Sequence, residues 1–290
     1  MSTKKVELVI LVCLILGAIV SSINVADIQA QDPRVHVYFL NIGQGDATLI
    51  TTPNGNQVLI DGGPTSKVLQ ELGRVMPFSD SSLDAIITTH TDADHLTGLA
   101  DVLERYDVEA IIETGMQCAT AICARYEKLA DAEGAPRTYA YRGYTLTIDE
   151  GVTLTILNPP QSVQDQTVKK TNNAGLVIKM TVGTQSVLFT ADVEASVEGE
   201  LVRSGLPLDS DFLKIGHHGS KTSTTQEFLD AVTPDGAFIE VGGRNTYGHP
   251  HPTVLERLAN MKIPVYRTDS DGLVELILDG TTATITKHGH

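Results

Sequence analysis

Tryptophan is absent from this chain of 290 residues, and phenylalanine and tyrosine together supply only 5% of it. Basic residues are also scarce, because 21 Lys and Arg stand against 36 Asp and Glu and leave a formal net charge of −15. A protein that tracks a long nucleic acid needs a basic surface for the phosphates and aromatic rings for the bases. The composition therefore disfavours a long nucleic acid as partner, while an acidic surface favours solubility.

Long apolar runs are missing too, apart from one near the N-terminus. It covers residues 8–20 and follows Lys4 and Lys5. The run is short for a stable membrane span, so we expect residues 1–30 to be a secretory signal peptide or an N-terminal anchor that uses residues 8–25. Both alternatives predict an extracytoplasmic protein.

Cysteine is rare as well, since only Cys118 and Cys123 follow Cys13 of the N-terminal segment. In an oxidising compartment these two residues could close a small loop, whereas in a reducing one they would be ordinary small apolar residues. Their spacing alone does not decide between the two.

Short β-rich runs and helical patterns alternate through the rest of the chain, whose 41% hydrophobic and 20% charged residues are typical of a globular protein. Three runs between residues 35 and 60 are separated by turn sequences and predict a meander of hairpins. Strand–helix units follow, a second hairpin is expected to turn at Gly183-Thr184, and the last third again alternates strands with helices. Two such halves predict an α/β (α+β) fold, a four-layer αββα sandwich, over residues 34–288.

Four potential metal ligands cluster where a strand-like run ends and a helical pattern begins at Leu96. They are His90, Asp92, Asp94 and His95. The first two alternate along an extended chain and can point the same way, while the other two start the turn into the helix. Carboxylates and neutral imidazoles are deprotonated near neutral pH, so the loop can bind one or two divalent cations with little pKa adjustment. The alternative is a solvated acidic turn in which Asp94 caps the helix.

Three more loops carry potential ligands directly after predicted strands. They contain Asp192, the pair His217 and His218, and His249. A carboxylate such as Asp192 can bridge two cations because each oxygen binds one; alternatively it caps the following helix. Five of the nine histidines fall in such loops, and this recurrence favours a metal centre.

Six segments together match a known family. They read F-L-N-I-G-Q-G-D-A from Phe39, L-I-D-G-G from Leu59, T-H-T-D-A-D-H from Thr89, T-A-D from Thr190, L-K-I-G-H-H-G-S from Leu213 and N-T-Y-G-H-P from Asn245. The chain resembles the metallo-β-lactamase superfamily, whose motif is H-x-H-x-D-H, and looks most like the extracytoplasmic domain of ComEC, the DNA-uptake channel protein of competent bacteria. The likeness covers about residues 35–278.

The resemblance implies a centre of one or two divalent ions. One ion would be held by Asp94, His95, Asp192 and His249. The other would be held by His90 and Asp92, sharing Asp192. Asp61 would orient a ligand from behind. The catalytic residues implied are Asp94 and, around the open face, Lys214, His217 and His218.

The chain also departs from the family pattern. Asp92 stands where the superfamily has a histidine, and no histidine occurs in residues 96–216. The His90/Asp92 site is therefore short of ligands. We expect one of His217 and His218 to contact that ion and the other to face the substrate, with Asn172 or Asn173 as further donors. Oxygen-rich coordination makes manganese a competitor of zinc.

The function that this resemblance implies is that of an exported metal-dependent hydrolase that cleaves phosphodiesters, with a cation activating water and stabilising the developing charge. The substrate would be nucleic acid or a small phosphodiester, met by a cationic patch of Lys214, Lys221 and Arg244; no protein partner is indicated. With at most one membrane span, the chain is not expected to be a channel. A lactonase or β-lactamase-like hydrolase of a small molecule, and a non-catalytic metal-binding module, remain as alternatives.

Overall fold

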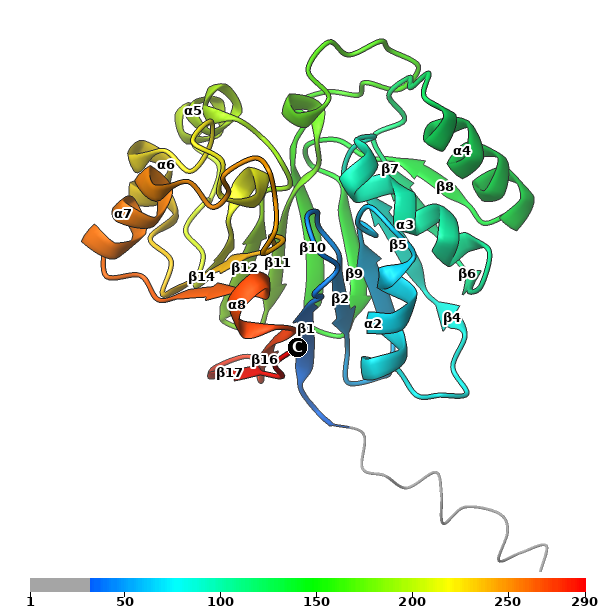
Figure 1. Ribbon diagram of the computed structural model, residues 1–290, viewed down its shortest axis with the longest axis horizontal. Coiled ribbons are helices and arrows are strands. Elements are labelled where there is room, and N and C mark those ends of the chain that lie inside the picture. The colour runs from blue at the N-terminus through cyan, green and yellow to red at the C-terminus, as the bar shows by residue number, and fades with distance from the viewer. Residues whose placement is uncertain (1–31) are drawn as a thin grey trace, which may run out of the picture. The chain divides into compact units, whose positions relative to one another are not determined.

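The computed structural model describes residues 32–290, and within it Pro33–His290 form one compact unit (Figure 1). The expected leader, residues 1–30, lies outside the described residues. Among the helices of residues 32–290, none is long and apolar enough to cross a membrane.

The first of two large sheets has eight strands, in the order β17-β16-β1-β2-β3-β5-β7-β8. Its antiparallel part is built from β1 (Val35–Phe39), β2 (Thr48–Thr51), β3 (Gln57–Ile60), β16 (Val274–Leu278) and β17 (Ala283–Lys287). Its parallel part adds β5 (Ala85–Thr88), β7 (Ile111–Glu113) and β8 (Arg137–Tyr139). The predicted meander is thus β1-β2-β3. In this sheet, strands pair in parallel only where helices connect them.

The second large sheet has seven strands, in the order β15-β14-β13-β12-β11-β10-β9. Antiparallel hairpins form one half from β9 (Thr145–Asp149), β10 (Val152–Asn158), β11 (Val177–Val182) and β12 (Gln185–Phe189). Parallel strands form the other half from β13 (Phe212–Lys214), β14 (Gly236–Ile239) and β15 (Val265–Arg267). A separate pair, β4 (Ser82–Leu83) and β6 (Asp107–Val108), forms a small third sheet.

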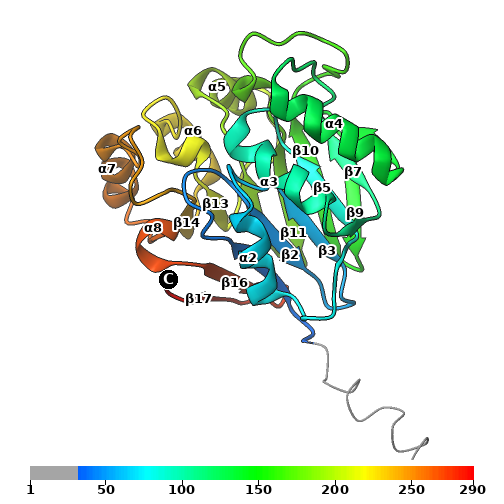
Figure 2. The same ribbon diagram turned by 45° about the vertical axis from the view of Figure 1, so that its right-hand side comes forward.

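Helices cover the outer face of each large sheet, with one group on either side of the molecule (Figures 1 and 2). The first sheet carries α2 (Lys67–Val75), α3 (Ala93–Leu103) and α4 (Ala121–Glu133), whose apolar residues share one core with that sheet. The second carries α5 (Ala195–Arg203), α6 (Gln226–Val232) and α7 (Pro252–Asn260). Short turns of helix complete the chain: η1 (Asn172–Ala174), η2 (Gly216–Gly219) and α8 (Thr268–Asp271).

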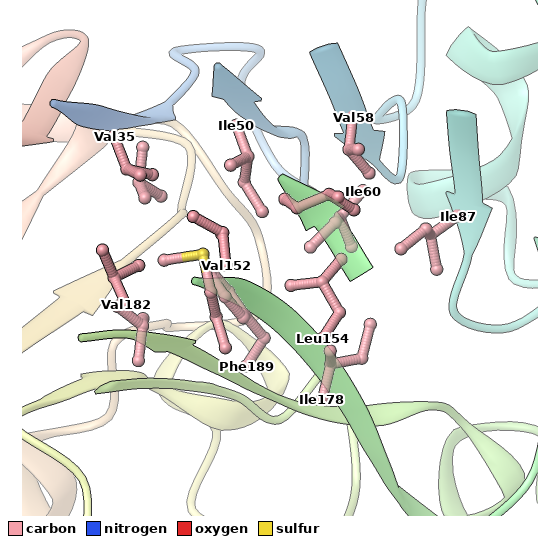
Figure 3. Packing of buried hydrophobic residues seen from close by; sticks show 14 of the residues in the cluster. Val35, Ile50, Val58, Ile60, Ile87, Val152, Leu154, Ile178, Val182 and Phe189 are labelled. Atoms are coloured by element: carbon pink, nitrogen blue, oxygen red, sulfur yellow. The ribbon is translucent and has the colours of Figure 1, made fainter. Parts of the chain in front are cut away.

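Between the two sheets lies a third apolar core (Figure 3). Ile50 and Ile87 of the first sheet point toward Leu154 and Phe189 of the second, and all four are buried. Because side chains alternate along a strand, the same strands also supply the cores beneath the helices: Leu49 and Ile86 pack there. Three apolar cores between four layers confirm the αββα sandwich.

Cys118 and Cys123, whose state the sequence left open, form a disulfide at the start of α4. Cys123 is buried beside the loop that follows β5, where its Sγ lies 3.8 Å from the carbonyl oxygen of Thr91. The disulfide therefore packs against the backbone of Thr91, the residue between His90 and Asp92.

Candidate metal centre

The candidate site is a cavity of about 170 Å³ to which both sheets contribute. It is lined by Gln44, Asp92, Asp94, Asn172, Asp192, His217, His218, Tyr247 and His249. The predicted ligands among them come shortly after strands, as expected: β5 leads to Asp92 and Asp94, β12 to Asp192, β13 to the histidine pair and β14 to His249.

A larger cavity, of about 450 Å³, lies beside β7 and β8 and is lined by residues that include Glu127, Arg137 and Tyr139. The guanidinium of Arg137 is already bound by Glu113, Glu127 and Asp131. No histidine lines this cavity, so the smaller cavity is where metal chemistry is feasible.

Asp192 is the centre of the donor cluster. Its Oδ2 lies 3.3 Å from His95 Nε2 and 3.3 Å from His218 Nε2. Asp94 joins them, since its Oδ2 is 3.3 Å from the same His218 nitrogen. The four ligand atoms lie within 4.8 Å of one another.

Several polar atoms around Asp192 are buried without a hydrogen-bond partner. They are Nε2 of His90, His95 and His218, Oδ1 of Asp192 and Nδ1 of His249. A buried polar atom without a partner costs about 1–3 kcal/mol, and several in one place call for an explanation. Two carboxylates and two imidazoles that converge in this way fit a first-row divalent cation.

His95 is held by Asp61 from behind. The Nδ1 of His95 donates to Asp61 Oδ2 at 2.8 Å, and Thr89 donates to Asp61 through both its backbone nitrogen (2.8 Å) and its hydroxyl (2.6 Å). With its proton on Nδ1, the ring presents Nε2 to the cluster. Asp61 thus occupies the orienting position that the resemblance implied.

His218 is held by a hydrogen bond to the carbonyl oxygen of Glu240 and by an ion-pair contact with Asp46, a residue that the sequence analysis missed. The Nδ1 of His218 lies 3.0 Å from Asp46 Oδ1 and 3.0 Å from the carbonyl oxygen of Glu240. Asp46 reaches this position because Gly45 has a positive φ of 142° and packs against the backbone of Asp94, where a Cβ would lie 2.2 Å from the carbonyl oxygen. The Gly-Gln-Gly-Asp segment looks like a turn in the sequence, yet it supplies Gln44 to the lining of the cavity and Asp46 to the support of His218.

Lys214 does not flank the open face, which corrects the sequence-based assignment. It is buried and forms an ion pair with Asp46, and it does not line the cavity. The reason is strand alternation: Phe212 of β13 points into the core between the sheets and Leu213 points toward the helices, so Lys214 points between the sheets again. Lys214 is therefore not part of the expected cationic patch.

Electrostatics in the cluster follow from burial and from the carboxylates. Burial by itself would lower the pKa values of His95 and His218, but Asp192 and the carboxylate behind each ring raise both well above the ordinary value. His90 differs, because burial and the neighbouring His95 ring, 4.1 Å away, lower its pKa. His90 is thus kept neutral, the form that binds a metal.

Residues near Asp192 also adopt left-handed backbone conformations that are uncommon outside glycine. Positive φ angles occur at Asp61 (57°), Ala191 (44°), His217 (51°) and His218 (52°). Each costs about 1–3 kcal/mol and persists only where the surrounding structure enforces it. Their concentration here is typical of a functional site.

Two alternatives based on helix capping do not hold. Asp94 lies inside the first turn of α3, which begins at Ala93 rather than at the predicted Leu96, and Asp92 takes the N-cap position without a side-chain cap bond. Glu194, not Asp192, precedes α5. The carboxylates of Asp94 and Asp192 are thus free of a capping role, and both line the cavity.

The other predicted ligands surround the cluster. His218 takes the place beside Asp94, His95 and Asp192 that the sequence analysis gave to His249. The expectation that either His217 or His218 contacts the His90/Asp92 ion stays a prediction. The rings of His249 and His217 lie 6.4 and 6.2 Å from that of His218, and His217 Nε2 is 3.8 Å from Asp192 Oδ2. His249 lines the cavity and stays a predicted ligand.

The second ion site is the one expected at His90 and Asp92. His90 Nε2 is 3.9 Å from Asp92 Oδ2, and neither residue belongs to a group of three donors among residues 32–290. Thr171 donates its hydroxyl to Asp92 Oδ1 at 2.7 Å, and Asn172 beside it lines the cavity. Asn173 instead bonds to Glu194 and Ser196. Of the two asparagines considered, the structure therefore offers Asn172 to this side of the site.

The match to known proteins agrees with this geometry. A family model described as the metallo-beta-lactamase superfamily matches residues 40–242. This chain belongs to the metallo-β-lactamase superfamily. Superfamily members bind divalent metals, and the donor cluster around Asp192 could hold such an ion. When bound, a divalent ion polarises a substrate oxygen and lowers the pKa of water.

Relatives of this metallo-β-lactamase-superfamily protein include competence proteins. ComE operon protein 3 of Bacillus subtilis is 32% identical over 256 residues, which cover 82% of this chain and 32% of that protein. Recombination protein 2 of Haemophilus influenzae is 32% identical over 254 residues, covering 86% of this chain and 29% of that protein. The chain thus spans about a third of the length of these relatives.

Solved structures show the fold. The metallo-beta-lactamase fold protein YhfI from Bacillus subtilis superposes with a TM-score of 0.54 at 14% identity, covering 81% of this chain and 96% of that one. The chain therefore has the metallo-β-lactamase fold, and its relatives include competence and recombination proteins.

Proposed function

We propose that this protein is a metal-dependent hydrolase, a phosphodiesterase that acts outside the cytoplasm. The observation that carries the proposal is the donor set: Asp92, Asp94 and Asp192 line one cavity, and the last two cluster with the buried imidazoles of His95 and His218. An oxygen-rich set of this kind suits one or two cations that neutralise a phosphoryl group, and manganese suits it as well as zinc. Relatives named for competence and recombination support a nucleic acid or a smaller nucleotide phosphodiester as substrate.

His217 is the residue best placed to move a proton. Its Nδ1 lies 3.1 Å from Thr222 Oγ1, and its ring is partly exposed in the cavity with Nε2 beside Asp192. A partly exposed imidazole can deliver a proton to a leaving oxygen, whereas the buried rings of His90, His95 and His218 are directed at the ligand cluster.

The extracytoplasmic location is supported by the disulfide, because structural disulfides persist in oxidising compartments. Mass spectrometry of the mature N-terminus tests it. A protein that retains Met1 and is recovered from the cytoplasm with free thiols would contradict it.

The activity is tested with the metal-loaded protein and three substrate classes: bis(p-nitrophenyl) phosphate with a short single-stranded oligonucleotide, a lactone, and a chromogenic β-lactam. We expect turnover of the phosphodiesters, lost in Asp192→Asn because an amide has neither the charge nor the bridging capacity of the carboxylate. Asp235→Asn, at an exposed carboxylate, is the matched control and should be fully active. Turnover of the lactone or β-lactam alone would overturn the proposal, and metal binding without turnover would indicate a binding module.

A further inference from the structure

An exposed aromatic ring stands at the mouth of the metal cavity. Phe78, Tyr141 and Tyr247 are the large hydrophobic residues exposed in residues 32–290, and among them only Tyr247 lines the cavity that holds Asp192. Its exposed fraction is 70%. The ring of Tyr247 stacks on that of His249, with centroids 5.7 Å apart and planes inclined by 25°.

The loop that carries Tyr247 is held in place by Asn245. The side-chain amide of Asn245 donates to the carbonyl oxygens of Gly242 and His249, both at 2.7 Å. Its Oδ1 accepts the backbone N–H groups of Tyr247 (3.2 Å) and His249 (3.0 Å). An aromatic ring on a loop fixed in this way loses little conformational entropy when a ligand stacks on it.

The size of the cavity indicates which part of a substrate meets Tyr247. At about 170 Å³ it is smaller than the ~300–1,000 Å³ of sites that enclose a whole small molecule. A phosphate group fits inside beside the ligand cluster, and the remainder of the substrate must lie on the rim. The chain has a net charge of −15, so it attracts phosphates outside the cavity only weakly. Affinity for the part of the substrate on the rim therefore has to come from contacts to its sugar and base.

We propose that Tyr247, backed by His249, is a stacking subsite for the base of the nucleotide next to the scissile phosphodiester. The proposal rests on the proposed phosphodiesterase function and names its substrate class: an unpaired nucleotide unit, either the end of a single strand or a small nucleotide diester. Gln44 and Asn172 line the same cavity, and although their amide oxygens accept from Gly242 and Thr171, their amide nitrogens can donate to the sugar or base. Stacking on an aromatic side chain accepts every base, so the subsite recognises the presence of a base and not its sequence.

Equilibrium binding to the metal-loaded protein tests the subsite without turnover. Adenosine 5′-monophosphate and ribose 5-phosphate share the phosphate and differ in the base. We expect the wild type to bind the first more tightly, by about 5- to 150-fold if one stacked base contributes as in other proteins. Tyr247→Ala should remove this preference, Tyr247→Phe should keep it, and Tyr141→Ala, at an exposed tyrosine away from the cavity, is the matched control. Metal content, measured for every variant, verifies that His249 and the ligand cluster are undisturbed.

Turnover adds a second readout. With a short single strand as substrate, Tyr247→Ala should raise KM by a similar factor, and it should have no effect when the terminal nucleotide is abasic. If the wild type binds both monophosphates equally, or if Tyr247→Ala weakens both equally at full metal content, the subsite is overturned. A wild type that prefers the nucleotide yet hydrolyses no phosphodiester would refute the proposed activity and leave the subsite standing.

Discussion

Replacing Lys214 with methionine should destabilise the fold, because the lysine is the buried counter-ion of the network behind His218. Asp46 and Lys214 are 4% and 2% exposed, and their side chains form an ion pair. Glu240 lies close enough to interact with both, and burial together with the Asp46 charge raises its pKa to about 8. Lys214→Met therefore leaves Asp46 as a buried carboxylate without its cation.

Breaking a buried ion pair by removing one partner costs about 3–5 kcal/mol, whereas replacing both partners is often close to neutral. We expect a loss of that size for Lys214→Met and a similar loss for Asp46→Asn. The double variant should recover a large part of it, with an interaction energy of about 0.5–3 kcal/mol. Lys221→Met, at an exposed lysine, is the control and should change stability by less than about 0.5 kcal/mol.

Urea unfolding followed by circular dichroism, on metal-free protein, measures these differences without interference from metal affinity. Stability at the wild-type level in Lys214→Met, combined with a reduced kcat, would refute the reasoning. That result would mean that the lysine reaches the substrate, as the sequence analysis assigned it.

Three further predictions concern ligands and pH. Asp61→Asn should raise the metal Kd about 10- to 100-fold, because His95 loses its charged partner; competition with a chromogenic chelator measures this, and an unchanged Kd would contradict the orienting role. His218→Ala should lose bound metal and His249→Ala should lose less, by elemental analysis; the opposite pattern would restore His249 as the ligand. Glu275 is buried, which raises its pKa, but hydrogen bonds from two histidines lower the pKa below the ordinary 4.5. Its contribution to stability is thus present above pH 4.5 and lost as the pH falls through the depressed pKa, so unfolding midpoints should show a weaker acid dependence in Glu275→Gln.

Much of the fold could be predicted from the chain alone, since each half repeats strands that lead into strand–helix units. The meander of β1, β2 and β3 and the hairpin of β11 and β12 have local signals: glycine-containing turns and alternating apolar residues. The small β4–β6 sheet was not predicted, because two-residue strands carry no periodicity and pair only once α3 brings them together. The start of α3 was placed too late because its first turn is made of charged ligands and not of apolar residues.

Most residues of the donor cluster were predicted, as was the support Asp61, but the supports Asp46 and Glu240 were not. The loops after β5, β12, β13 and β14 contain histidines and aspartates, which are conspicuous in a sequence. Asp46 and Glu240 are single acids, one in a turn and the other at a strand end, and they meet only because the β1–β2 loop of one sheet reaches β14 of the other. Which histidine joins Asp94 depends on the same packing of the two sheets. Sequence motifs alone therefore could not decide between His218 and His249.

The division of the ligands between the sheets has a consequence for how the protein binds metal. Asp94 and His95 follow β5 of the first sheet, while Asp192 and His218 follow β12 and β13 of the second. Each half alone offers two donors of the cluster. Once the inter-sheet core is packed, the two pairs face each other at a high effective concentration, and a cation binds as it would to a preformed chelator. In turn, a bound ion cross-links the halves and stabilises their packing in proportion to the logarithm of its concentration over Kd. Metal affinity in this protein is therefore also a measure of how well the two sheets fit together.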